Sequence, residues 1–96
     1  MASDYRISWS ENALTNLDQI ISYLELNWTK REVENFKLKL SVQLNVIRNF
    51  PKMFPAASSN ERVRKAILSK QTSIIYEVSG DTLLIVGLLD NRSDHV

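Results

Sequence analysis

The sequence contains no cysteine, one histidine, and only two glycines and two prolines among its 96 residues. The absence of cysteine excludes disulfides, cysteine-based zinc sites and cysteine nucleophiles, and it is compatible with a reducing cytoplasm. A single histidine does not provide a zinc site, and Gly80 and Gly87 do not form a glycine-rich phosphate loop. We therefore expect no metal and no cofactor.

Long apolar runs are also missing. No stretch approaches the ~18 residues that a membrane-spanning helix needs, and residues 1–6 lack the apolar core of a secretory signal. We therefore expect a soluble, cytoplasmic protein with no membrane partner. Apolar residues make up 44% and charged residues 24% of the chain, which is the composition of an ordinary globular protein, here a single domain over residues 1–96.

The net charge of +1 conceals an uneven distribution. From Arg48 to Lys70 there are six basic residues and one acidic residue, a local balance of +5 that leaves −4 for the remainder. Such an asymmetry can direct an anionic partner to one face, and a solvated basic loop and strand edge is the alternative interpretation. The six bases are Arg48, Lys52, Arg62, Arg64, Lys65 and Lys70.

A short strand and a first helix are predicted at the start of the chain. Residues 5–10 alternate apolar and polar, so Tyr5, Ile7 and Trp9 should face inward. Ser10 suits the N-cap of an amphipathic helix over about 11–27. Its apolar stripe consists of Leu14, Leu17, Ile20, Ile21, Leu24 and Trp28, and the side chains that fall away from it are Asn16, Asp18 and Glu25.

A second helix is predicted from Lys30 to about Asn49, with Thr29 and Glu32 at the spacing of a capping box. It carries two apolar stripes, although covering one face of a sheet requires only one. Either the helix is deeply buried or its second stripe contacts a partner, and we favour the partner. The first stripe is Val33, Phe36, Leu40, Leu44 and Ile47, and the second is Leu38, Val42 and Val46.

Three strands are predicted after a polar loop over 56–60. They span 62–68, 72–78 and 82–89, and the turn at residues 79–81 joins the last two. The apolar run of the last strand predicts a central strand covered on both faces. The predicted architecture is α+β: an N-terminal strand and a two-helix hairpin packed on a twisted, mostly antiparallel four-stranded sheet.

On the basic strand, Arg62 and Arg64 should alternate outward. Lys65 shares the parity of Val63 and Ile67, so it is expected to face the helices with its stem buried.

This order of elements resembles the RelE/ParE toxin superfamily over essentially the whole chain. Similar motifs are the start Ile7-Ser8-Trp9-Ser10, the helix pattern Leu17-x-x-Ile20-x-x-Tyr23-Leu24, the helix end Asn49-Phe50-Pro51, the hairpin from Ile74 to Ile85, and the terminal Asp90-Asn91-Arg92. Two departures are present. The region 57–61 lacks the glycine that often precedes the basic strand, and the chain stops at Val96 without the C-terminal helix of some RNase members.

The resemblance implies a growth inhibitor that a cognate antitoxin keeps silent within a toxin–antitoxin hetero-oligomer. The stripe of Leu38, Val42 and Val46 suits an antitoxin helix. A ParE-like member would bind DNA gyrase without an active site, whereas a RelE-like member would cleave ribosome-bound mRNA without a metal. The low net charge and the long helix hairpin favour the ParE-like branch. An inactive toxin or an unrelated protein-interaction domain is the third alternative.

In either branch, the resemblance implies a role for basic residues in the C-terminal part of the chain. For an RNase, the catalytic candidates are Arg64, Arg92 and His95, which would supply positive charge and proton transfer at the phosphate. For either target, Arg62, Arg64, Lys65 and Arg92 are the candidate contacts. Arg92 could instead pair with a neighbouring aspartate, and His95 lies near a chain end, where residues are usually poorly ordered.

Overall fold

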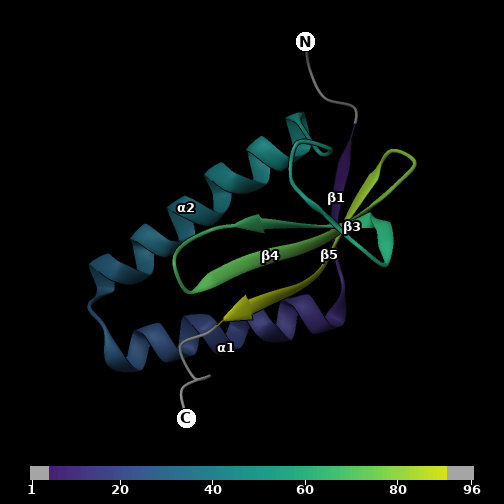
Figure 1. The fold of residues 1–96 in the computed structure, drawn as a ribbon. Helices are drawn as coiled ribbons and strands as arrows, with labels where there is room; N and C mark the ends of the chain where they lie inside the picture. The colour runs from purple at the N-terminus through teal and green to yellow at the C-terminus, as the bar shows by residue number, and fades with distance from the viewer. Residues whose placement is uncertain (1–4, 91–96) are drawn as a thin grey trace.

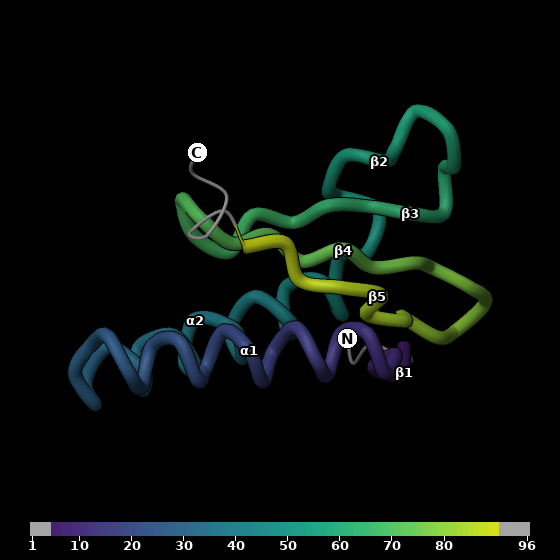
Figure 2. Tube along the Cα trace, turned by 90° about the horizontal axis from the view of Figure 1, so that it is seen from below, coloured from purple at the N-terminus to yellow at the C-terminus, as the bar shows by residue number. Residues whose placement is uncertain are grey.

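The structure is a computed structural model that describes residues 5–90, and these residues form two helices and five strands (Figure 1). The elements are β1 (Arg6–Trp9), α1 (Glu11–Asn27), α2 (Lys30–Asn49), β2 (Ala56–Ala57), β3 (Asn60–Ile67), β4 (Thr72–Ser79) and β5 (Thr82–Asp90). Both helices lie on one side of the sheet formed by β3, β4 and β5 (Figure 2). Neither helix in this range is long and apolar enough to cross a membrane.

The strands form one mixed sheet in the order β1-β5-β4-β3-β2. β1 runs parallel to β5, with Ile7 opposite Leu83, and the other neighbours are antiparallel. The predicted α+β architecture is confirmed. The sheet gains a fifth strand because two residues of the predicted polar loop, Ala56 and Ala57, pair with β3. The adjoining bond from the Lys65 N–H to the Pro55 carbonyl, 3.1 Å, continues that pairing.

Local capping sets the helix ends where the sequence predicted them. The Ser10 hydroxyl accepts a hydrogen bond from the Ala13 N–H at 3.0 Å, and the Thr29 hydroxyl accepts one from the Glu32 N–H at 3.3 Å. Each bond satisfies a backbone donor that the first turn of a helix leaves unpaired. Ser10 also donates to the Val86 carbonyl at 3.1 Å, so this cap fixes α1 to β5.

The buried face of α1 is narrower than predicted. Leu14 and Trp28 are 51% and 54% exposed, and Ala13 is buried instead. Asn16, predicted to point away, is half-buried, and its Oδ1 accepts a hydrogen bond from the Leu88 N–H at 3.1 Å. Leu88 pairs with Ile74 of β4, but the pairing of β1 with the other side of β5 ends at Trp9 and Ile85, so Asn16 takes the place of a strand partner there.

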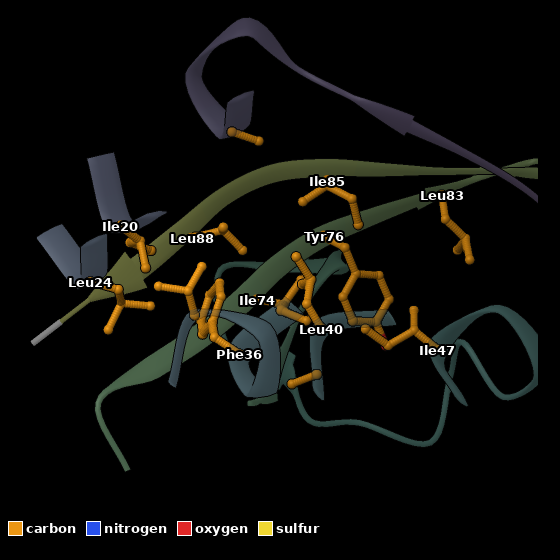
Figure 3. Close-up of a cluster of buried hydrophobic side chains, with 13 residues drawn as sticks. Ile20, Leu24, Phe36, Leu40, Ile47, Ile74, Tyr76, Leu83, Ile85 and Leu88 are labelled. Carbon is orange, nitrogen blue, oxygen red and sulfur yellow. The ribbon is translucent and has the colours of Figure 1, made fainter. Parts of the chain in front are cut away.

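The core lies between the helix pair and the sheet (Figure 3). The first stripe of α2 is buried except for Leu44, which is half-buried, so this stripe is confirmed as core. β5 is central in the sheet, but Leu89 is exposed and Leu84 is only half-buried, so the prediction that both faces are covered was wrong. The core residues are Ala13, Ile20, Leu24, Val33, Phe36, Leu40, Ile47, Ala66, Ile74, Tyr76, Leu83, Ile85 and Leu88.

Candidate functional site

The second stripe of α2 is not part of the core. Leu38 is 65% and Val42 is 56% exposed, and Val46 is half-buried. These exposed side chains therefore contribute little to the packing of the core. Of these three residues, Val42 borders an open groove of about 400 Å³, which is lined by Ile7, Ser41, Val42, Leu44, Asn45 and Arg48. The alternative that the stripe is deeply buried is therefore wrong.

A basic cleft lies where β3 meets the loop after α2 and the turn between β4 and β5. Its volume is about 420 Å³, and three of its lining side chains are basic against one acidic side chain. The lining residues are Tyr5, Lys52, Glu61, Arg62, Arg64, Val78 and Gly80. Lys52 belongs to the basic run that the sequence revealed, whereas no sequence signal connects Tyr5 or Gly80 to this cleft.

Arg64 is held by the loop before β2. The guanidinium Nη1 donates to the Phe54 carbonyl at 2.7 Å and to the Lys52 carbonyl at 3.2 Å, and its buried Nε has no hydrogen-bond partner. The prediction that Arg64 points outward was wrong, since it shares the helix-facing side of β3 with the fully buried Ala66. The Nη1 group of this cation therefore holds the loop in place.

The opposite parity places Lys65 on the open face of the sheet. Lys65 is exposed and its neighbour Ile67 is 66% exposed, so the prediction of a buried stem was wrong. The strand turns the small Ala66, rather than the larger Val63 and Ile67, toward the helices. Arg62 is exposed as predicted.

Tyr76 lies beside Arg64 in the β3–β4 register and is fully buried. Its hydroxyl donates to the Pro51 carbonyl at 2.6 Å, and its ring meets Phe54 edge to face, with ring centroids 6.5 Å apart. Burial raises the pKa of Tyr76 to about 12, although the positive charge of Arg64 lowers it in part. Arg64 and Tyr76 together fix the carbonyls of the 50–55 loop, and we call this pair the loop clamp.

The predicted contact residues therefore do not form one cluster. Arg62 and Arg64 line the basic cleft, whereas Lys65 lines a separate, mostly apolar groove with Ile67. Arg92 and His95 lie outside the described residues, so their predicted roles stay predictions. Within residues 5–90, no group of three or more acidic or histidine side chains is arranged to hold a metal ion.

Several solved structures similar to this one are described as toxins or toxin–antitoxin complexes. The chromosomal ParDE toxin–antitoxin system from P. aeruginosa is similar with a TM-score of 0.74 and 15% identity, over 93% of this chain and 98% of that chain. The E. coli DinJ-YafQ toxin–antitoxin complex gives a TM-score of 0.65 at 13% identity, over 92% and 93%. The YoeB dimer from Staphylococcus aureus gives 0.60 at 15% identity, over 91% and 97%. At these identities the likeness establishes the RelE/ParE-like fold.

The family follows from the sequence profile. Residues 7–95 match the family described as ParE toxin of type II toxin-antitoxin system, parDE. The chain belongs to this family and is a toxin of the type II toxin–antitoxin class, which confirms the predicted resemblance. A search of curated protein sequences gave no match.

Proposed function

We propose that this toxin inhibits bacterial growth by binding DNA gyrase as a protein ligand, and that a cognate antitoxin holds it silent in a hetero-oligomer. The match to the ParE family over residues 7–95 supports the toxin role. The choice of target rests on one observation, the loop clamp. Its arginine lines the basic cleft, and its tyrosine is paired with that arginine in the β3–β4 register, so both are candidates for an RNA-cleaving mechanism there.

Cleavage of RNA by its own 2′-hydroxyl needs a base, an acid and a cation directed at the phosphate. In the loop clamp, Arg64 donates to two backbone carbonyls and Tyr76 donates to a third. The Tyr76 hydroxyl is buried and donates to the Pro51 carbonyl, and burial raises its pKa to about 12, so both the geometry and the pKa disfavour a role as a base. Because both side chains form hydrogen bonds to backbone carbonyls, we favour a binding protein over a nuclease.

The exposed stripe of α2 is the proposed antitoxin site. Leu38 and Val42 are solvent-exposed, and Val42 borders an open groove, which suits the apolar face of a partner helix. Replacing both with glutamate should weaken antitoxin binding by at least tenfold. Since both side chains are exposed, the variant should keep the wild-type circular dichroism spectrum, and unchanged affinity in a folded variant would refute this site.

Induced expression with pulse labelling tests the target. The proposal expects DNA synthesis to fall before protein synthesis, and purified toxin should inhibit supercoiling by gyrase and accumulate cleaved DNA. An early fall in protein synthesis with cleaved messages would refute gyrase as the target.

The second candidate is a RelE-like, ribosome-dependent mRNA endonuclease. It is favoured by the basic cleft, where Lys52 and Arg62 lie beside Arg64. In that case Arg92→Ala combined with removal of His95 and Val96 should abolish message cleavage and toxicity. Unchanged toxicity of this variant would count against Arg92 and His95 as catalytic residues.

A further inference from the structure

The basic cleft contains positive charge that the fold does not neutralise. Its lining includes the bases Lys52, Arg62 and Arg64 and the single acid Glu61, so three positive charges and one negative charge give a local balance of +2. Lys52 and Arg62 are exposed, and neither forms an ion pair with another residue in the range 5–90. Two of the three cations are therefore available to an anion from outside the chain.

Arg64 contributes a cation that is fixed in place. Its Nη1 donates to the carbonyls of Lys52 and Phe54, at 3.2 and 2.7 Å. The other two nitrogens of the guanidinium, Nε and Nη2, donate to no residue in the range 5–90, and of these two atoms only Nε is buried. Phosphate oxygens accept strong, charge-assisted hydrogen bonds from guanidinium N–H groups. The loop therefore holds Arg64 in position and leaves its Nη2 for an external acceptor.

The strand pairing places these cations side by side at one end of the sheet. The turn before β3 and the turn between β4 and β5 extend from this same end (Figure 2). Val63 pairs with Glu77, so the preceding Arg62 lies next to Val78, and both line the cleft. Since Arg62 and Arg64 are two residues apart on one strand, they point to the same side with a separation of about 7 Å along the strand. The two arginines therefore form a short row, and Lys52 joins them from the loop after α2.

The composition of the lining indicates the kind of ligand. The centre of a protein–protein interface is rich in aromatic and apolar side chains and poor in charged ones, whereas protein–DNA interfaces are more polar and more positive. Four of the seven lining residues are charged, and only Tyr5 and Val78 have mainly apolar side chains. Sites for single-stranded nucleic acids usually provide several aromatic rings on which bases stack, and Tyr5 is the only ring in this lining. The chemistry therefore favours the phosphate backbone of a duplex.

We propose that the basic cleft binds the phosphate backbone of duplex DNA, independently of base sequence. Lys52, Arg62 and the Nη2 of Arg64 each contact a phosphate, and Glu61 weakens the attraction. Because three phosphate contacts give only weak binding, this site adds to the protein contact with gyrase and does not replace it. The phosphate site follows from the cleft itself, whereas the choice of DNA over RNA rests on the proposed gyrase target.

The salt dependence of DNA binding measures the number of phosphate contacts. The full chain, made by cell-free synthesis to avoid growth inhibition, is titrated into a short labelled duplex of mixed sequence, and binding is followed by fluorescence anisotropy. With three contacts, the logarithm of the affinity should fall with the logarithm of the salt concentration at a slope of about −2.7, which is a fall of about 40-fold between about 50 and 200 mM salt.

Single charge removals test the cleft itself. Lys52→Gln and Arg62→Gln each remove one contact, so each should make the slope shallower by about 0.9 and leave a fall of about 12-fold over the same salt range. Glu61→Gln should raise the affinity by roughly twofold or more, the scale of one exposed charge pair. Lys70→Gln is the matched control, because Lys70 belongs to the same basic run but lies outside the cleft. All four side chains are exposed, so the variants should retain the wild-type circular dichroism spectrum.

A wild-type chain that does not bind the duplex, or cleft variants that bind it as Lys70→Gln does, would overturn the proposal. Tighter binding to a single-stranded RNA of the same length, or to a polyglutamate peptide, would overturn it as well. Capture of gyrase by the wild type in the absence of DNA separates this inference from the proposed function. Duplex binding with the expected slope supports the cleft whether or not gyrase is captured, and failure to capture gyrase refutes only the target.

Discussion

Replacing Tyr76 with phenylalanine isolates one bond of the loop clamp. The ring and its edge-to-face contact with Phe54 are retained, while the hydroxyl that donates to the Pro51 carbonyl is lost. The carbonyl then lacks its buried donor, which costs about 1–3 kcal/mol. Urea denaturation at pH 7 should therefore show a lower unfolding free energy for Tyr76→Phe, with an unchanged slope against urea.

The pH dependence of stability separates this bond from simple packing. The folded state raises the pKa of Tyr76 from 10.0 to about 12, so between these values the unfolded chain releases the proton and the folded chain keeps it. The contribution of the protonated Tyr76 hydroxyl to the unfolding free energy is fully present below pH 10 and is lost as the pH rises toward 12. At about 1.4 kcal/mol per unit, the loss is about 3 kcal/mol.

Comparing the two proteins in urea at pH 9, 10, 11 and 12 removes the contribution of lysine titration, which both share. Above pH 10, the difference in unfolding free energy between wild type and the phenylalanine variant should shrink progressively. The variant has no phenol at position 76, so its own unfolding free energy should not show this decrease. Parallel pH profiles for the two proteins would refute both the raised pKa and the role of burial in causing it.

Three substitutions test how α1 is fixed to β5. Gly87→Ala should cost about 1 kcal/mol in urea denaturation, because its Cβ would lie 3.2 Å from the Asn12 amide nitrogen and 3.3 Å from the Asn16 oxygen; wild-type stability would contradict this. Asn16→Leu should cost about 1–3 kcal/mol, because the Leu88 N–H loses its acceptor, and hydrogen exchange at that amide should accelerate. Ser10→Ala should cost about 1 kcal/mol and lower the melting temperature by roughly 4–8 °C, and an unchanged melting curve would argue against the cap.

Local signals in the sequence accounted for the helices and most of the strands. Ser10 and Thr29 start helices through bonds to residues three positions later, so short-range pattern contains the necessary information. β2 has no such signal. Its two alanines are a strand only because β3 and the loop clamp bring them together, which is a tertiary effect.

The site was harder to predict because it depends on strand parity. The apolar Val63 and Ile67 suggested the helix-facing side of β3, but the fully buried residue of this strand is Ala66, which has the opposite parity. A shift of parity by one residue exchanges the faces of a whole strand. Compared with the prediction, Arg64 therefore faces the helices and Lys65 faces the open side of the sheet. The basic residues predicted to form one contact surface lie on two faces of β3.

Because the basic residues lie on two faces of β3, the local charge of +5 over residues 48–70 is not one continuous surface. Because Arg64 is bonded to the carbonyls of Lys52 and Phe54, the basic run partly stabilises the loop after α2 instead of attracting an anion. The helix hairpin shows the converse, because Leu38 and Val42 contribute little to the fold yet remain apolar and exposed. Arg64 holds the loop through hydrogen bonds, and Leu38 and Val42 leave an apolar surface outside the core. Both observations favour a protein-binding function over cleavage of a nucleic acid.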